Sequence, residues 1–356
     1  MTQVAISTPP DLVRSPSPGS RSAHAKQIGT YVQFAVDSNN QSGILSLDGE
    51  DASIASDALL TLLEKTSRLE KDQLRKLAVQ ILAVHDRLPA SLLLKGVQRI
   101  GTDAAFSGQY SDVFRGKYGE KDVALRRLRA YLMFSGTSKA HLKQEFYSEA
   151  LVYKTLSHPH ILPLLGISED VFEYTPCTVL PWMENGHIVR HIQTLKERGD
   201  LSGNAYSIRV GEWLRQVASG LAYLHSEGFV HGDLRGTNIL IDSEENAQLT
   251  DFGMSRITET VQETYASMPD GTVRWQAPEV VDPDLFDLST KGPTYASDVY
   301  SFGCICIEVL CLIIVCVSRA HTPTALHTET ALWEHERLPG GYTHREGRAA
   351  SQALTP

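Results

Sequence analysis

The sequence predicts an α+β protein in which a small β-rich lobe carrying one helix is followed by a larger helical lobe, with a short helical hairpin in front. Three observations lead to this class. Apolar residues recur at helical spacing between residues 51 and 90, strand-like segments separated by glycine-containing turns follow, and the chain becomes mostly helical after Pro181. With 42% hydrophobic and 21% charged residues, the 356-residue chain has a globular composition, which argues against collagen, a coiled coil or a wholly disordered chain.

The first part of the chain is predicted to hold a leader and a helical extension. Residues 1 to about 40 are rich in Ser, Pro and Thr without apolar periodicity, so we expect a disordered leader that cannot offset its ordering entropy. In residues 41–93 the pattern becomes helical. Leu59 and Leu63 share one face, and a second apolar face follows a capping-box sequence that begins at Ser67. We interpret this extension as a helical hairpin that packs on the next domain.

Both lobes are visible as a change of periodicity. In the small lobe, residues 94–180, the predicted elements are strands at Val97 to Thr102, Asp112 to Lys117 and Val123 to Leu128, a helix from about His141 to Thr155, and strands around Ile161 to Ile167 and Cys177 to Leu180. The larger lobe, residues 181–310, contains a helical stripe formed by Trp213, Val217, Leu221 and Leu224. No internal repeat accompanies this change.

Two short motifs in the larger lobe carry candidate chemistry: HGDLRGTN at residues 231–238 and DFG at residues 251–253. Each borders apolar strand-like residues, so both are predicted on loops beside a small hairpin. That arrangement would bring Asp233, Asn238 and Asp251 within reach of one site. The trio suits phosphoryl transfer, because one carboxylate must orient a hydroxyl nucleophile while hard oxygen ligands hold Mg²⁺ against phosphates.

Further motifs occur in a recognisable order: GQYSDV at 108–113, VALR at 123–126, Glu149, the two motifs above, APE at 277–279 and DVYSFG at 298–303. From about Leu94 to Leu310 the chain resembles the eukaryotic protein kinases, most closely the tyrosine-kinase-like group and its expanded fungal branch. The helical segment 51–90 also resembles the one that precedes the kinase domain in that branch. The resemblance implies a bilobal protein-kinase-like fold, ATP and Mg²⁺ as cofactors, and protein substrates.

The resemblance also assigns roles to individual residues. Asp233 would orient the substrate hydroxyl, with Arg235 and Asn238 as the other catalytic-loop residues, while Asn238 and Asp251 would hold Mg²⁺. Residues expected to contact the nucleotide, directly or through an ion pair, are Gly108, Val113, Ala124, Arg126, Glu149, Leu180, Met183, Leu240 and Asp251. Glu149 is expected to pair with the cation of the third strand, and Leu180 resembles the gatekeeper before the hinge. A regulatory stack between the lobes is expected from Tyr153, Leu164, His231 and Phe252.

Substrate specificity is indicated by two features with opposite implications. Gly271-Thr272 resembles the substrate platform of Ser/Thr kinases, whereas Arg235 occupies a position where Ser/Thr kinases usually carry Lys and thus resembles tyrosine kinases. The balance favours Ser/Thr over Tyr. The loop between the DFG and APE motifs offers the candidate phosphorylation sites Thr258, Thr260, Thr264, Tyr265 and Ser267.

Three departures from the family pattern affect the predicted site. Phe106 and Ser111 stand where the phosphate loop has its first and third glycines, so the loop is expected to be stiffer and a poorer phosphate cradle. Arg126 replaces the third-strand Lys and presents a planar fork in place of a point charge. Gly232 replaces the Arg before the catalytic Asp. These changes leave open a pseudokinase that serves as an ATP-binding or scaffolding module.

The end of the chain departs most from the family pattern. Residues 311–356 resemble no kinase helix, so we expect a disordered, non-kinase tail and an incomplete larger lobe. An incomplete lobe would expose one apolar side of its central helix. We hypothesise a truncated or mis-spliced product, with an inactive kinase fragment or a divergent functional tail as the alternatives.

Charge and cysteine usage bear on partners and location. The formal net charge of −9 disfavours nucleic acid and anionic membranes as partners. Arg127 and Arg129 alternate with Arg126 along a strand, so we expect them on a solvated outer face rather than on a nucleic acid. Five cysteines without CxxC spacing, and no secretory signal, favour reduced thiols in an intracellular protein, cytoplasmic or nuclear.

Overall fold

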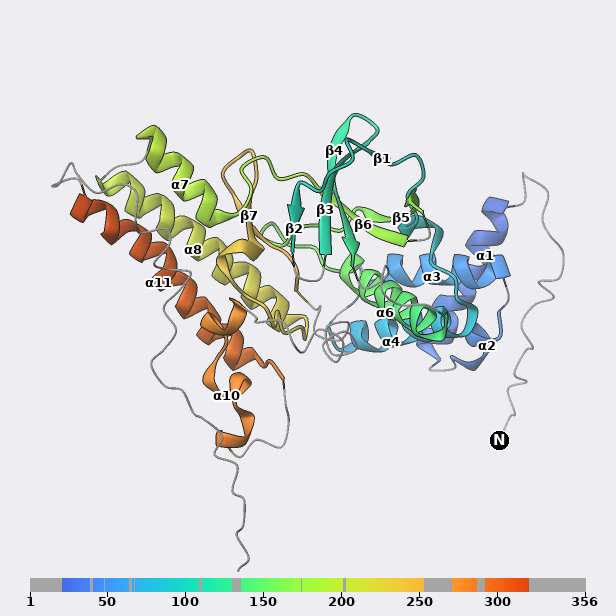
Figure 1. Ribbon diagram of the computed structural model, residues 1–356. Coiled ribbons are helices and arrows are strands. Elements are labelled where there is room, and N and C mark those ends of the chain that lie inside the picture. Colours follow the sequence, from blue (N-terminus) through green and yellow to red (C-terminus); the bar gives the residue numbers. More distant parts are fainter. Residues whose placement is uncertain are drawn as a thin grey trace, which may run out of the picture. The chain divides into compact units, whose positions relative to one another are not determined.

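The structure is a computed structural model that describes residues 21–38, 41–47, 49–63, 66, 68–108, 111–129, 136–173, 175–200, 203–252, 271–286 and 292–319. Elements up to Val309 belong to one compact unit. Within it, helices precede a six-stranded antiparallel sheet with one long helix, and further helices follow (Figure 1). The α+β class and the order of elements agree with the prediction. None of the helices in the described ranges is long and apolar enough to cross a membrane.

The N-terminal helices contain one difference from the sequence prediction. Helix α1 spans Arg21–Asp37, within the segment expected to be disordered, and it packs against α3 (Gly49–Leu63). Its apolar residues Ile28, Val32 and Ala35 recur at helical spacing and are buried. The expectation of a leader without structure is therefore wrong for this helix, because three well-placed apolar side chains suffice once a partner helix covers them.

The predicted helical hairpin is confirmed as α3 and α4 (Arg68–His85), with the four-residue helix α2 (Ser42–Leu45) before it. Buried residues on the inner faces include Leu59, Leu63, Leu77 and Ile81. The capping box begins at Ser67, which lies outside the described residues. After α4 the chain forms the short 3₁₀ helix η1 (Ala90–Leu92) and enters the sheet.

The sheet has the strand order β1-β3-β4-β6-β5, and β2 pairs with β3. Its strands are β1 (Gln98–Arg99), β2 (Phe106–Ser107), β3 (Ser111–Tyr118), β4 (Lys121–Leu128), β5 (Gly166–Phe172) and β6 (Thr175–Pro181). The strand predicted around Ile161 begins only at Gly166. The first residues of the predicted strand bond instead to the two-stranded sheet of the larger lobe, since the Leu162 amide donates to the Leu249 carbonyl at 2.9 Å.

The small lobe contains one helix, as predicted. Helix α6 spans Gly136–Lys154 and begins a few residues earlier than the apolar spacing indicates. Leu142, Phe146, Ala150 and Leu151 are buried in a hydrophobic core shared with residues of α1, α3 and α4. The helical extension and the helix of the small lobe thus stabilise each other by burying the same apolar surface.

The larger lobe consists of helices around a two-stranded hairpin. Its elements are α7 (Ile188–Arg198), α8 (Gly203–Ser226), η2 (Gly236–Asn238), β7 (Ile239–Ile241), β8 (Ala247–Leu249), η3 (Gly271–Arg274), α10 (Pro278–Val281), η4 (Pro283–Phe286) and α11 (Tyr295–Arg319). The predicted stripe on α8 is buried, and the Trp213 indole nitrogen donates to the Glu245 carbonyl at 2.9 Å.

Helix α11 extends past the predicted boundary at residue 310 and ends at Arg319. The nine-residue apolar run that starts at Val309 continues the helix, which the absence of family motifs did not reveal. On the described part of α11, Val299 and Ile307 are exposed by 59% and 64%, so one apolar side of this helix faces solvent as expected. Residues 320–356 lie outside the described part of the chain.

Candidate active site

One buried carboxylate on α11 hydrogen-bonds to the backbone of the HGDLRGTN segment. Asp298 accepts hydrogen bonds from the backbone amides of His231 at 2.7 Å and Gly232 at 2.9 Å, one on each oxygen. Its Oδ2 also lies 2.8 Å from Nε2 of His225, near the end of α8. Gly232 adopts φ +79°, a conformation that glycine reaches without steric cost. These bonds fix the backbone that leads to Asp233.

Two of the three residues predicted to share a site, Asp233 and Asn238, are joined by hydrogen bonds, and the residue before Asp251 is bonded to Asn238. Asn238 donates from Nδ2 to the Asp233 carboxylate at 3.0 Å and to the Asp233 carbonyl at 2.7 Å. The backbone amide of Thr250 donates to the Asn238 carbonyl at 3.0 Å, which places the DFG segment beside the catalytic loop. Asp233 has a half-exposed carboxylate, and Arg235 Nε lies 3.4 Å from it. The catalytic loop and the residue before the DFG motif are therefore adjacent, and a shared site for Asp233, Asn238 and Asp251 stays a prediction.

Asp251 has an unusual backbone and a definite partner. Its φ of +60° lies in the left-handed region, where Asp is tolerated at a modest cost in energy. Its carboxylate Oδ1 lies 3.1 Å from Nε of Arg126 on β4. The arginine that replaces the family's lysine thus contacts the predicted metal ligand, and sequence reasoning did not anticipate this pair. The expected pair between Arg126 and Glu149 of α6 stays a prediction.

Apolar side chains surround the place where the resemblance puts the adenine ring. Ala124 and Leu180 are Cα partners across β4 and β6, and Val113 and Arg126 are partners across β3 and β4. Because side chains alternate along strands, Ala124 and Arg126 lie on the same face of the sheet. Leu180 and Met183 are buried in one hydrophobic core, and the partly buried Ala124 and Leu240 pack against that core.

The phosphate loop closes as a tight turn between β2 and β3. The Gly108 amide donates to the Ser111 carbonyl at 2.8 Å, and a Cβ on Gly108 would come within 3.3 Å of the same oxygen. Gln109 and Tyr110 lie outside the described residues. Phe106, in place of the first glycine, is stacked with Trp182 of the hinge at 6.3 Å between ring centroids. The bulky residue therefore makes an aromatic contact in a position where the family carries no side chain.

Three of the four residues predicted to form a stack between the lobes, Tyr153, His231 and Phe252, lie in contact. The rings of Tyr153 and Phe252 meet edge to face at 4.7 Å, and Phe252 lies 6.0 Å from His231. The Tyr153 hydroxyl donates to the Leu162 carbonyl at 2.6 Å, and burial raises its pKa. Burial also lowers the pKa of His231 to about 4, so this imidazole is neutral at physiological pH. These ring contacts connect the small-lobe helix, the DFG segment and the catalytic loop.

The expected solvated face holds for Arg129 but not for Arg127, because the Arg129 side chain is 37% exposed and that of Arg127 only 19%. Arg127 is 4.9 Å from the Phe114 ring centroid and 5.0 Å from that of Phe172, and both arginines pair with Asp112, at 3.3 and 2.7 Å. Burial opposes ionisation of Asp112, but hydrogen bonds from Arg129, Ser107 and Arg127 hold its pKa below the ordinary value. Two rings and a carboxylate thus cover Arg127, which alternation alone could not show.

Glu308 of α11 is a site residue that sequence reasoning missed. Its carboxylate accepts a hydrogen bond from the Trp275 indole at 3.1 Å, and burial raises its pKa. A Cβ on Gly236 would lie 2.8 Å from Glu308 Oε2 and 2.6 Å from Val189 Cγ2, so a larger residue there would have to displace these side chains. The turn that carries Asn238 therefore packs closely on α11. In the sequence, only Gly236 of the HGDLRGTN motif indicated that another element packs closely on this turn.

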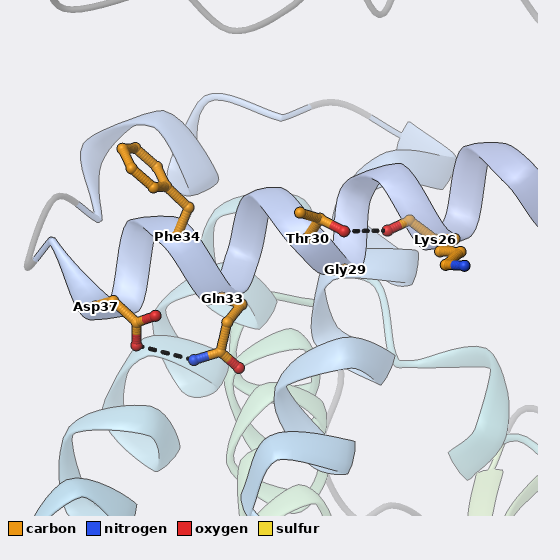
Figure 2. Close-up of a pocket in the computed structure, with 6 residues that line it drawn as sticks. All are labelled: Lys26, Gly29, Thr30, Gln33, Phe34 and Asp37. Carbon is orange, nitrogen blue, oxygen red and sulfur yellow. Dashed lines mark hydrogen bonds between the residues drawn. The ribbon is translucent and has the colours of Figure 1, made fainter.

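The other candidate features lie elsewhere. Within the described residues, no group of three or more His, Cys, Asp or Glu could hold a metal by itself. A surface hollow along α1 is lined by Lys26, Gly29, Thr30, Gln33, Phe34 and Asp37 (Figure 2). All six belong to one helix and none is a predicted site residue. The described part of the chain therefore offers Asn238 and Asp251 as oxygen ligands that would need phosphates to complete a site.

Comparison with known proteins agrees with this geometry. A family model described as protein tyrosine and serine/threonine kinase matches residues 102–332, more than half of the chain. The chain belongs to this family. The match extends beyond residue 310, where the sequence motifs end. Members of this family generally use ATP and Mg²⁺ and act on proteins, and the chain has the bilobal fold of the family.

Individual kinases show the same likeness. The serine/threonine/tyrosine-protein kinase HT1 of Arabidopsis thaliana is 30% identical over 206 residues, which cover 57% of this chain and 48% of that protein. Wall-associated receptor kinase-like 14 is 33% identical over 60% of this chain and 28% of its own length. Mitogen-activated protein kinase kinase kinase 3 is 33% identical over 57% of this chain and 30% of its own length. Both come from the same plant, and the chain spans about half or less of these relatives.

Proposed function

We propose that this kinase-family protein transfers the γ-phosphoryl group of ATP to hydroxyl groups of proteins. The observation that carries the proposal is the bonded set of Asp233, Asn238 and Thr250, which brings the catalytic loop and the DFG segment together at 3.0 Å. Phosphoryl transfer needs a positioned carboxylate beside metal ligands more than it needs covalent chemistry from the protein. Kinases among the relatives support the same reaction.

The chain's own residues can perform distinct parts of this reaction. Asp233, half-exposed and oriented by the Asn238 amide, would accept a hydrogen bond from the substrate hydroxyl and direct its lone pair toward phosphorus. Arg235, 3.4 Å from the same carboxylate, supplies positive charge where negative charge develops. Asp298 keeps the loop backbone in place through two amide hydrogen bonds.

The donor set fits Mg²⁺ and a nucleotide. Carboxylate and amide oxygens of Asp251 and Asn238 are the hard ligands that Mg²⁺ prefers, and they adjoin the cation of Arg126. When bound, Mg²⁺ would neutralise phosphate charge. Arg126 would have to exchange part of its contact with Asp251 for contacts to the α- and β-phosphates. The apolar residues Ala124, Leu180, Met183 and Leu240 suit a flat aromatic base.

We propose Ser/Thr in preference to Tyr as the phosphate acceptor. The motif Gly271-Thr272 supports it by resemblance, while Arg235 is the feature that favours Tyr. Several relatives are named serine/threonine kinases, and one of them is named a serine/threonine/tyrosine kinase. A mixed peptide library offering either hydroxyl in matched sequences decides between them.

A binding and turnover experiment tests the proposal. A ligand at about 100 times its Kd adds about 2.7 kcal/mol of apparent stability, so Mg-ATP should raise the thermal midpoint of the full chain. Phosphate transfer to the peptide library should accompany this shift, and Asp233→Asn should abolish transfer while leaving the shift intact. Asp200→Asn, an exposed carboxylate after α7, serves as the control. A thermal shift without phosphate transfer would establish a pseudokinase instead. The absence of both the shift and the transfer would refute nucleotide binding.

A further inference from the structure

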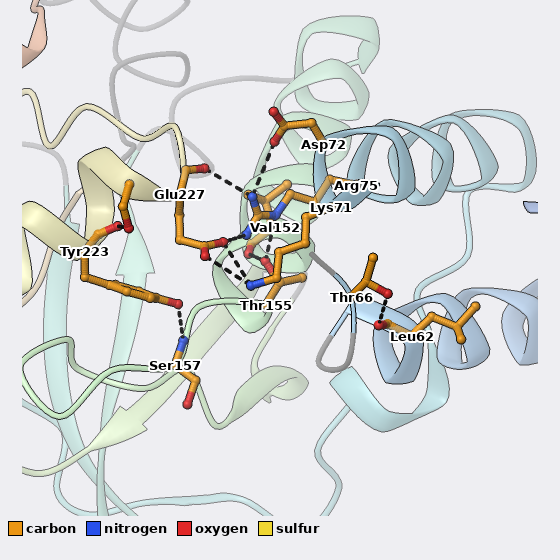
Figure 3. Close-up of polar contacts among 11 residues, drawn as sticks. Leu62, Thr66, Lys71, Asp72, Arg75, Val152, Thr155, Ser157, Tyr223 and Glu227 are labelled. Atoms are coloured by element: carbon orange, nitrogen blue, oxygen red, sulfur yellow. Dashed lines mark hydrogen bonds and ion pairs between the residues drawn. The ribbon is translucent and has the colours of Figure 1, made fainter. Parts of the chain in front are cut away.

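The helical extension meets the kinase lobes through one buried arginine. Arg75 of α4 is 6% exposed in its side chain, and Figure 3 shows it pointing toward the ends of two other helices. Its Nη2 donates to Glu227 Oε2 at 2.6 Å and its Nη1 to the Glu227 carbonyl at 3.2 Å. Its Nε donates to the Thr155 hydroxyl at 3.1 Å. The same guanidinium lies 4.9 Å from the Phe229 ring centroid.

The two segments that Arg75 contacts are those that lead into the active site. Thr155 follows directly after α6, the helix that carries Glu149. Glu227 follows directly after α8, and Phe229 stands two residues before His231 and four before Asp233. One side chain from the extension therefore bonds to the end of the small-lobe helix and to the entry of the catalytic loop.

The exit from α8 has a defined shape that this contact preserves. Gly228 adopts φ +87°, and the Phe229 amide donates to the Leu224 carbonyl at 2.9 Å, which is a left-handed glycine cap. A cation at this end also complements the helix dipole. A second bond joins the same two segments, because the Ser157 amide donates to the Tyr223 hydroxyl at 2.9 Å (Figure 3).

A buried ion pair adds little net stability compared with apolar packing, so its value lies in the geometry it imposes. Three donors of one planar fork reach two carboxyl-terminal helix ends at once, which lysine cannot do. Lys71 offers the contrast. It also pairs with Glu227, at 3.1 Å, and the hydrogen bonds described for it reach only that carboxylate. Burial opposes ionisation of Glu227, but both cations hold its pKa below the ordinary value.

We propose that Arg75 is a positioning residue, through which the helical extension fixes the end of α6 and the entry of the catalytic loop in their catalytic arrangement. The inference rests on the proposed function and deepens it. The extension is then a required part of the catalytic unit rather than a separate appendage, since it also shares one hydrophobic core with α6. Displacing reacting groups by about 1 Å costs on the order of 100-fold in rate.

The test compares Arg75→Met with Lys71→Met in the full chain. Each change removes one cation from Glu227 and leaves the other in place, so neither strands a buried carboxylate and both variants are expected to fold. Arg75→Met should lower kcat at least tenfold with a smaller change in KM for ATP. Lys71→Met should stay within twofold. Arg75→Lys should show a smaller decrease in kcat than Arg75→Met. Thr155→Val, which removes the hydroxyl that Arg75 contacts, should also lower kcat.

Hydrogen exchange of the same proteins provides a readout that does not depend on turnover. Arg75→Met should speed exchange at least tenfold for amides of residues 150–157 and 228–233 together, while Lys71→Met should not. Equal kcat and equal exchange in the two methionine variants would overturn the inference. If the unmodified protein has no transfer activity, the proposed function fails while exchange alone still decides whether Arg75 couples the two segments.

Discussion

Replacing Asp298 with Asn should damage catalysis through the backbone of the catalytic loop. The carboxylate uses one oxygen for the His231 amide at 2.7 Å and the other for the Gly232 amide at 2.9 Å. An asparagine of the same shape keeps one oxygen and places an NH₂ group where the other was. Whichever way this amide turns, its NH₂ group meets a backbone donor that has lost its acceptor.

The size of the effect follows from these contacts. A buried donor without a partner costs about 1–3 kcal/mol, and the remaining bonds lose the strength that the negative charge gave them. The bond with His225 at 2.8 Å is weakened as well. We expect the free energy of unfolding to fall by about 3 kcal/mol in total, which a typical domain with 5–15 kcal/mol tolerates. The displaced loop should lower kcat by about 100-fold.

Urea unfolding and single-turnover phosphate transfer measure the two effects separately. Asp57→Asn is the control, because its two carboxylate oxygens also accept the amides of Ala90 and Ser91, both at 3.1 Å, at an exposed turn that the contacts of Arg75 do not involve. This control should lose stability without losing kcat per folded molecule. If Asp298→Asn keeps the wild-type kcat, or if both variants lose the same fraction of kcat per folded molecule, Asp298 does not position the loop.

Three further predictions concern pH, the nucleotide site and two glycines. Burial lowers the pKa of His231 from 6.5 to about 4, so between these values the unfolded chain binds a proton that the native protein does not. The free energy of unfolding should therefore fall as pH drops below about 6.5, by roughly 2 kcal/mol at about pH 5, and His231→Phe should lose this contribution in urea titrations. Arg126→Lys should restore a point charge and raise kcat by up to about 100-fold; an unchanged or lower kcat would contradict the expected misplacement of the phosphate. Gly116→Ala should lower stability by about 1–3 kcal/mol, because its Cβ would lie 2.7 Å from the Gln98 carbonyl, whereas Gly211→Ala on α8, with open space around it, should raise stability by up to about 1 kcal/mol. Thermal unfolding of both variants shows whether the opposite signs hold.

Local features of the chain were readable from the sequence. The helices α3, α4 and α8 follow from apolar residues at helical spacing, and β3 and β4 follow from short strand-like runs around a Gly turn. The bond between Asn238 and Asp233 spans five residues, so the motif itself contains both partners. The reaction class could be predicted for the same reason, because its residues lie in compact motifs whose order is characteristic of the kinase family.

Contacts between distant parts of the chain required the tertiary structure. Arg126 and Asp251 meet across the lobes, Asp298 reaches a loop 67 residues earlier, and Arg75 reaches a carboxylate 152 residues later. Periodicity reports which face of an element is apolar, but it does not report which element covers that face. The same limit explains α1, whose three buried apolar residues became meaningful only once α3 lay against them. The chemistry proposed for this site can be read from compact motifs, whereas packing between residues far apart in the chain sets how those residues are held.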